Sequence, residues 1–432
     1  MHGVEVVRVP ERTGLSMRRG VISRLILPSG VDASATPALV GRGLRGFCDG
    51  FLAVLLPAYL LALGLGQLDV GLISSATLIG SAAATILVGI LARRYPLRRM
   101  LIWAAGLMTA TGIGFAGLSS LRALLVIAFV GTLNPGSGDV SLFLPLELAR
   151  LAGSATGDAR TAIFARYSLV GGLSAALGAL AAAVPCWFAA RAGVSTLAAL
   201  RAMFGIYALA GVTLWPVYRR LPEPRMQDRP HGVPLGRPRR IVTRLALLFS
   251  VDAFAGGLVV NSLMSLWLMQ RFGFSPGATG QFFFGAGLLS AGSQLVAVPL
   301  ARKIGLLNTM VFTHIPASLC LIAAAFAPSL WLTLALLLVR SALSQMDVPT
   351  RTAYVMAVVS PPERPAAASF TAVPRSLAAA LGPTLAGALL ATGWTGAPLI
   401  ACGLLKIAYD LTLLGVFRRV RPTNELGDIF RS

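Results

Sequence analysis

The stretch Val70–Ala92 reads VGLISSATLIGSAAATILVGILA and contains no charged residue. A helix needs ~20 apolar residues to cross the ~30 Å hydrocarbon core of a bilayer, and this stretch reaches that length. Arg99–Ser119 is a second run of the same kind. Lipid offers no hydrogen bonds to the backbone, and these runs are too long and too uniform for the alternating strands of a barrel. We therefore interpret them as transmembrane helices.

The composition of the whole chain agrees with this interpretation. Hydrophobic residues make up 56% of the chain and charged residues 12%. Soluble domains carry about 25% charged residues, so too few polar groups remain here to cover a water-exposed surface. Lys and Arg number 37 against 16 Asp and Glu, for a formal net charge of +21. Because cytoplasmic loops of membrane proteins collect basic residues, this charge does not indicate a nucleic-acid partner.

The sequence predicts about twelve spans separated by short loops. The N-terminal six are 42–64, 70–92, 99–119, 122–144, 164–186 and 200–218, and the C-terminal six are 243–270, 278–301, 307–327, 330–350, 367–391 and 395–417. The fold class is thus an all-α integral membrane protein. The expected domains are an N-terminal segment (1–41), a six-helix bundle (42–218), a linker rich in Arg and Pro (219–242), a second six-helix bundle (243–417) and a tail (418–432).

The loops predict the orientation. Basic residues gather in the linker, in the tail and in alternate loops such as 93–99 and 302–303, whereas the other loops hold few. The positive-inside rule then places both termini in the cytoplasm, which requires an even number of spans. We expect a multi-pass protein of the cell (inner or plasma) membrane.

The two halves repeat one another. Arg93 and Arg302 stand at the same offset as Arg166 and Arg375, and as Gly178 and Gly387. Several matches in order, at equivalent places in the topology, indicate a duplicated six-helix unit. Each half has an even number of spans, so the two pseudo-symmetric bundles run in parallel orientation.

The loop after the second span carries a motif and a second copy. The first copy runs from Gly89 through Arg93 and Arg94 to Arg98 and Arg99; the second holds Arg302, Lys303 and Gly305. With the six-plus-six layout, this resembles the major facilitator superfamily over roughly residues 40 to 418. Within it, the segments 138–147, 160–172 and 347–387 look like a bacterial group without a well-defined substrate.

The resemblance implies an alternating-access permease whose spans one, four, seven and ten line a central cavity. The family's loop motif carries an acid that helps to close the cytoplasmic side, but Arg93 replaces it here. Either other acids supply the pairing, or the gate is built differently. The family's antiporter signature is absent from span five, so it does not argue for efflux.

Charged residues within spans are the strongest functional candidates, since each costs at least ~2.5 kcal/mol to insert unless it finds a partner or water. For the central cavity these are Asp49, Asp252 and Arg340. A carboxylate removed from water holds a proton more tightly, so Asp49 or Asp252 is a candidate proton carrier. Arg340 is expected to face the substrate or to pair with one of them. The alternative for Asp49 is a structural pair with Arg45, one helical turn away.

A second set lies at the cytoplasmic ends of the spans. Asp139 with Arg166, and Asp347 with Arg375, recur on adjacent spans of both halves. We interpret them as two related ion pairs that latch the cytoplasmic gate, the alternative being plain structural pairing. His314 stands alone in span nine, a peripheral position, and is interpreted as structural.

The leading functional prediction is a secondary active transporter of an unidentified small molecule. No GxxxxGK[ST] motif occurs, so an ion gradient, most simply of protons, is the expected driving force, and efflux is one direction to consider. A transport-inactive sensor on the same scaffold and a polytopic membrane enzyme are the alternatives. The few histidines and scattered cysteines match no metal or catalytic motif, so no enzyme activity, metal or cofactor is expected. We expect membrane lipids as partners, and we expect the protein to be a monomer.

Overall fold

The computed structural model describes residues 27, 31–92, 94–136, 141–154, 157–221, 239–359 and 363–418, and every regular element within them is a helix. Eleven helical segments in this part of the chain are long and apolar enough to cross a membrane, and a shorter apolar helix, Leu121–Val130, accompanies them. The predicted all-α membrane fold is confirmed. The side of the membrane on which the termini lie stays a prediction.

The helices of the first half follow the predicted spans closely at most boundaries. They are α2 (Thr36–Ala62), α3 (Gln67–Leu91), α4 (Leu97–Gly117), α5 (Leu121–Val130), α6 (Phe143–Ala152), α7 (Gly157–Leu180), α8 (Val184–Ala192) and α9 (Thr196–Arg219). Two short 3₁₀ turns, η1 (Ala33–Ala35) and η2 (Ala181–Ala183), precede α2 and join α7 to α8.

The second half contains a similar series. Its helices are α10 (Arg239–Gly257), α11 (Asn261–Phe272), α12 (Pro276–Ile304), α13 (Leu306–Phe326), α14 (Leu330–Ser344), α15 (Asp347–Ala357), α16 (Arg364–Ala391) and α17 (Ala397–Phe417). Between α12 and α13 the chain turns at Gly305, whose φ of 88° lies in the region that favours glycine.

The predicted span 122–144 is not one continuous helix. Helix α5 ends at Val130, and the described backbone from Gly131 to Gly136 is not helical, since it contains two glycines and Pro135. Predicted spans seven and ten are also interrupted, at 258–260 and 345–346. Non-helical backbone at membrane depth is tolerated where it borders a cavity or other protein.

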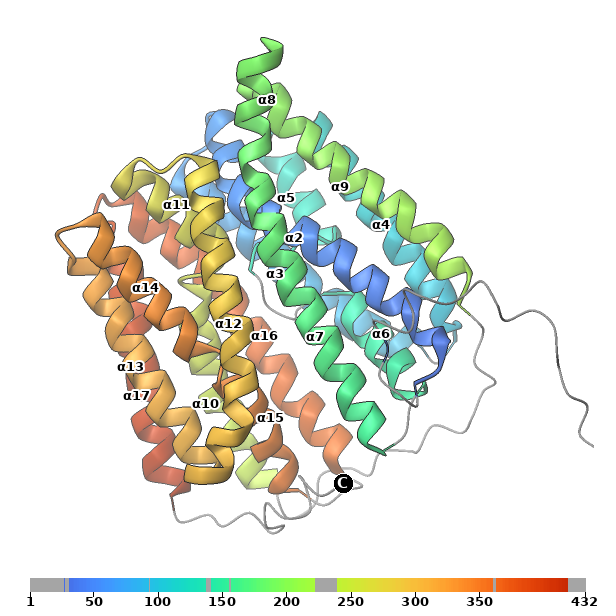
Figure 1. Ribbon diagram of the computed structural model, residues 1–432, viewed down its shortest axis with the longest axis vertical. Helices are drawn as coiled ribbons and strands as arrows, with labels where there is room; N and C mark the ends of the chain where they lie inside the picture. The colour runs from blue at the N-terminus through green and yellow to red at the C-terminus, as the bar shows by residue number, and fades with distance from the viewer. Residues whose placement is uncertain are drawn as a thin grey trace, which may run out of the picture.

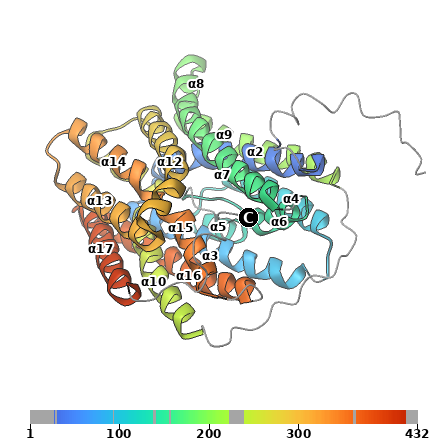
Figure 2. The same ribbon diagram turned by 60° about the horizontal axis from the view of Figure 1, so that its bottom comes forward.

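The helices form two groups, with α2 to α9 on one side and α10 to α17 on the other (Figure 1). Helix α3 crosses to pack along α16, and both views place these two helices side by side (Figure 1 and Figure 2). Here Gly71 approaches Pro383 so closely that a Cβ atom would lie 2.4 Å from the Pro383 carbonyl oxygen. Small residues thus allow the two halves to touch backbone to backbone. The domain boundaries drawn from the sequence stay predictions.

Candidate functional site

A cavity of about 220 Å³ lies between the two groups of helices. It is lined by α2 and α7 from the first half and by α11, α12 and α14 from the second. The interrupted spans contribute Asn134, Val259 and Gln345, so each break in a helix borders this space. Its polar lining residues are Arg42, Asp49, Asn134, Ser168, Asn261, Ser290, Gln294, Arg340, Ser341, Ser344 and Gln345.

Two oppositely charged side chains line this cavity from opposite halves of the molecule. Asp49 belongs to α2 and Arg340 to α14. Neither forms a hydrogen bond or ion pair with any residue that the structure describes, and the same holds for the side chains of Gln294 and Gln345. Asp49 and Arg340 are two of the three charged residues that the sequence predicts for the central cavity, and the structure brings both to the same space.

The alternative pairing of Asp49 with Arg45 is not formed. The Arg45 guanidinium instead donates to the carboxylate of Glu147 on α6. The hydroxyls of Tyr167 on α7 and Tyr218 on α9 also donate to Glu147, each over 2.5 Å. We call these four residues the Glu147 cluster. Because it occupies Arg45, it leaves Asp49 to the cavity.

The Glu147 cluster was not predicted from the sequence. Glu147 is completely buried, and it is the single acid in the apolar stretch Phe143–Ala152. That isolation was the available signal. Its partners could not be read from the sequence, because Arg45 lies 102 positions away.

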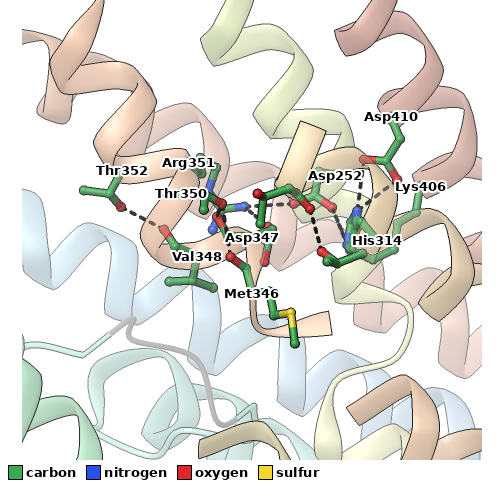
Figure 3. A network of polar contacts seen from close by, with 12 residues as sticks. Asp252, His314, Met346, Asp347, Val348, Thr350, Arg351, Thr352, Lys406 and Asp410 are labelled. Carbon is green, nitrogen blue, oxygen red and sulfur yellow. Dashed lines mark hydrogen bonds and ion pairs between the residues drawn. The ribbon is translucent and has the colours of Figure 1, made fainter. Parts of the chain in front are cut away.

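Asp252 does not line the cavity but lies in a buried cluster of charges in the second half (Figure 3). Lys406 Nζ is 2.6 Å from Asp252 Oδ1, and Arg351 Nη1 is 3.2 Å from Asp252 Oδ2. Arg351 also reaches Asp347 over 2.9 Å. We call the whole group the C-terminal charge cluster: Asp252, His314, Asp347, Arg351, Lys406 and Asp410.

His314 occupies one end of the C-terminal charge cluster (Figure 3). Its Nδ1 lies 3.0 Å from Asp410 Oδ2, and its Nε2 lies 3.2 Å from Lys406 Nζ. In a neutral imidazole, Nδ1–H would donate to Asp410 while Nε2 accepts from Lys406. Lys406 and Asp410 are four residues apart on α17, a spacing at which two side chains can pair on one helix face, whereas in the structure His314 lies between them and Lys406 contacts Asp252.

Of the two predicted gate pairs, the structure describes both members of only one, Asp347 and Arg375. Asp139 lies outside the described residues, so its pairing with Arg166 stays a prediction. Asp347 contacts Arg351, four residues further along α15. Its proposed link to Arg375 on α16 also stays a prediction.

The two copies of the loop motif occupy equivalent turns between helices. Gly89 is in the last turns of α3, Arg93 lies outside the described residues, and Arg94, Arg98 and Arg99 lie at or just before the start of α4. In the second copy Arg302 and Lys303 form the last turn of α12, before Gly305. Cations at a helix C-terminus are favoured by the helix dipole.

No group of three or more metal-ligating side chains occurs in the part of the chain that the structure describes. The cysteines Cys48, Cys186, Cys320 and Cys402 are free thiols.

Comparison with known proteins agrees with this architecture. The family model described as Major Facilitator Superfamily matches residues 38–254 and again 245–430. Among curated proteins, "Uncharacterized membrane protein YJR124C" of Saccharomyces cerevisiae is 24% identical over 412 residues, covering 87% of this chain and 92% of its own.

Solved structures with the same fold include transporters of different solutes. A mutant of the nucleoside transporter NupG superposes with a TM-score of 0.71 at 14% identity, covering 89% of this chain and 100% of that one. The xylose transporter XylE from E. coli, in an inward open conformation, gives a TM-score of 0.69 at 14% identity, covering 91% and 98%. A peptide transporter of the POT family gives 0.68 at 13% identity, covering 91% and 98%.

Together, a membrane-embedded helical fold and a polar cavity between two helix groups define a multi-pass transporter rather than an enzyme. The match of the family model over nearly the whole chain makes the assignment specific: this protein belongs to the major facilitator superfamily. The resemblance to an uncharacterised bacterial group stays a prediction, because the curated relative is a yeast protein.

Proposed function

We propose that this protein is a secondary active transporter that moves a small solute through the cavity by alternating access. The observation that carries the proposal is the cavity itself. Both groups of helices line it, and each contributes a charge, Asp49 or Arg340, that forms no hydrogen bond or ion pair with a described residue. A binding site between two bundles is the arrangement that rocking motions expose to one side at a time.

Hydrogen bonds between the two halves support a state that is closed at one end. Ser74 Oγ and Ser262 Oγ are 3.1 Å apart, and Ser265 Oγ donates to the Val54 carbonyl over 3.2 Å. On α2, the cavity-lining residues run from Arg42 to Ala53, and all of them lie on the N-terminal side of Val54. With the termini in the cytoplasm as predicted, the cavity extends toward the cytoplasm. Opening the other end would require these hydrogen bonds to break.

We further propose that transport is coupled to protons through the C-terminal charge cluster. The cluster contains three carboxylates but only two permanent cations, Arg351 and Lys406. With a neutral His314 it carries one excess negative charge, and one bound proton would neutralise it. A buried charge without a counter-charge is strongly destabilising. Uptake and release of that proton would therefore favour different arrangements of α10, α13, α15 and α17.

Within the cluster, the pair of His314 and Asp410 is the candidate proton carrier. The carboxylate of Asp252 already has two cations within 3.2 Å, so its charge is matched. Asp410 has no such pair of cations, and its hydrogen-bond partner is the titratable ring of His314. Tyr409 packs its ring edge to face against His314, with the centroids 6.2 Å apart. This refines the assignment from the sequence, in which Asp49 or Asp252 would carry the proton.

The proposed function is tested in sealed membrane vesicles of both orientations. Vesicles containing the protein would be supplied with a pooled library of metabolites and drugs, with and without an imposed proton gradient. Gradient-dependent accumulation of a compound would establish secondary transport and give its direction, with export tested first. Vesicles in which the folded protein accumulates no compound from the library under either condition would contradict the proposal.

The oligomeric state and the cellular membrane are also part of the proposal. We propose that it works as a monomer in the plasma membrane. Each half of the cavity comes from the same chain, so a single copy supplies both sides of the site. Cross-linking in native membranes and fractionation of cell membranes test these two statements.

A further inference from the structure

We propose that the transported solute is amphoteric, a small molecule with one cationic and one anionic group that bind Asp49 and Arg340 respectively. This inference rests on the proposed transport function and specifies its substrate class. The starting observation is that the cavity presents two opposite charges that do not satisfy one another. They line the same space but form no ion pair with each other.

The two charges stand at similar depth on opposite walls. Asp49 precedes the end of α2 at Ala62 by roughly 20 Å of helix, counted at 1.5 Å per residue. Arg340 follows the start of α14 at Leu330 by roughly 15 Å on the same count. Both helix ends lie at the end of the molecule where the halves are joined by hydrogen bonds. A solute bound between the walls therefore meets both groups at once.

The energetics of the cavity favour a solute with both charges. An ionised group that faces a low-dielectric space without a counter-charge is costly. A carboxylate or similar anion on the solute would bind the Arg340 guanidinium through paired, charge-assisted hydrogen bonds. An ammonium group would bind Asp49. A solute with only one charge would leave the other protein charge unmatched, and so would bind more weakly.

The other charged residue of the cavity is Arg42, whose charge also acts on Asp49, although the two form no ion pair. Its guanidinium lies over the ring of Tyr167, 5.2 Å from the ring centroid, and packs against Gly171. This places its charge beside α7, whereas Arg340 belongs to the opposite wall. The anionic group of the solute is therefore assigned to Arg340.

The remaining lining limits the size and character of the solute. Phe282, Phe283, Met264 and Leu337 supply an apolar wall beside the polar residues. The volume of about 220 Å³ is below the ~300–1,000 Å³ of pockets that take drug-sized ligands. An amphoteric metabolite with a short apolar body fits this description better than an oligomer or a neutral sugar.

The test uses compounds that share a carbon skeleton and differ in charge. One set is phenylalanine, phenethylamine and 3-phenylpropionate; a second is 4-aminobutyrate, butylamine and butyrate. Vesicles with the full-length protein would be incubated with a metabolite extract plus both sets. The compounds that accumulate inside would then be identified by mass spectrometry. We expect amphoteric compounds to accumulate and their single-charge relatives to be excluded.

Variants connect this preference to the two residues. Asp49→Asn and Arg340→Gln should each lower accumulation of the amphoteric solute by at least about tenfold, because one of its charges loses its partner. Asp49→Asn should also improve competition by the anion-only relative, and Arg340→Gln by the cation-only one. Asp69→Asn, on the exposed first turn of α3, and Arg191→Gln, beside Trp187, are matched controls outside the cavity.

Several outcomes separate this inference from the transport proposal. Accumulation of neutral or singly charged compounds, with the competition profile unchanged in both variants, would overturn the inference and leave the transporter intact. Unchanged accumulation of an amphoteric solute in both variants would also overturn it. If the folded protein accumulates nothing, the transport proposal fails first. Thermal unfolding of each purified variant excludes loss of fold as the cause of a lost signal.

Discussion

At the residue scale, Glu147 illustrates how a single acid can organise four helices. It receives hydrogen bonds from α2, α7 and α9 while it sits on α6. A buried carboxylate is tolerated only when its oxygens are bonded and its charge is matched, and here a guanidinium and two hydroxyls do both. The Glu147 cluster therefore acts as a fastening within the first half, next to the cavity but not part of it.

Replacing Glu147 by Gln should destabilise the protein by about 3–5 kcal/mol, because Arg45 would keep its charge in a buried place without a counter-charge. Tyr167→Phe and Tyr218→Phe remove one hydroxyl each and should cost about 1–3 kcal/mol. Thermal unfolding in detergent would measure all three. Equal stability of the Glu147→Gln variant and the parent would show that the carboxylate is not the fastening.

The C-terminal charge cluster leads to a functional prediction at the same scale. His314→Gln and Asp410→Asn remove the proposed proton carrier without touching the cavity. We expect solute exchange across the membrane to continue in both variants, while accumulation driven by a pH gradient falls to the level of vesicles without the protein. Parallel measurements of exchange and of accumulation separate the two effects.

His231→Gln is the matched control for these variants, because His231 lies in the predicted linker between the bundles. It should leave both exchange and accumulation unchanged. Persistence of pH-driven accumulation in His314→Gln and Asp410→Asn would assign proton coupling elsewhere, with Asp49 as the next candidate.

At the element scale, the contact between α3 and α16 depends on close approach of their backbones. A Cβ atom at Gly71 would meet backbone atoms of Pro383, and Gly387 faces Gly71 in the same contact. The Ser75 hydroxyl then accepts a hydrogen bond from the Thr384 amide over 3.0 Å. These two helices come from different halves, so their packing decides how the halves meet.

Gly71→Leu should therefore force α3 and α16 apart and reduce transport more than it reduces the amount of folded protein. Gly106→Ala, on α4, is the control: a Cβ there meets nothing within 4 Å, and Ala is favoured over Gly in a helix by roughly 0.5–1 kcal/mol. Transport per folded molecule, measured in vesicles, compares the two. A fully active Gly71→Leu variant would exclude a role for this close contact.

At the scale of the whole molecule, the joined end and the cavity correspond to one state of the transport cycle that we propose. Bonds such as Ser74 to Ser262 connect α3 of the first half to α11 of the second. If alternating access operates, this end must open and the other must close. The connection is therefore a place where the cycle can be stopped.

A disulfide across this connection should stop transport. The variant carries Ser74→Cys and Ser262→Cys in a background where Cys48, Cys186, Cys320 and Cys402 are replaced by Ser or Ala. Under oxidising conditions we expect transport to cease, and reductant should restore it. Each single-cysteine variant should stay active under both conditions. Transport that continues with the cross-link shown to be formed would contradict alternating access through this end.

The all-α membrane fold follows from the sequence alone. Long apolar runs have one stable form in lipid, and the pattern is local, so helices such as α3 and α13 appear within a few residues of their predicted bounds. The same pattern placed Asp49 and Arg340 within membrane-spanning runs. Pro135 and Gly136 marked a break in span four, but the predicted span ran through it because hydrophobicity alone does not record where a helix ends.

Which charged side chains pair with one another depends on how helices that are distant in the sequence pack together. Arg45 is one turn from Asp49 yet pairs with Glu147, and Lys406 is one turn from Asp410 yet pairs with Asp252. Local spacing favoured the wrong partner in both cases. A buried ion pair is stable only where packing excludes water and completes the remaining hydrogen bonds. In these two pairs the partners come from helices 102 and 154 positions away in the sequence. Asp49 and Arg340 are the two cavity residues that this long-range packing leaves without an ion pair among the described residues.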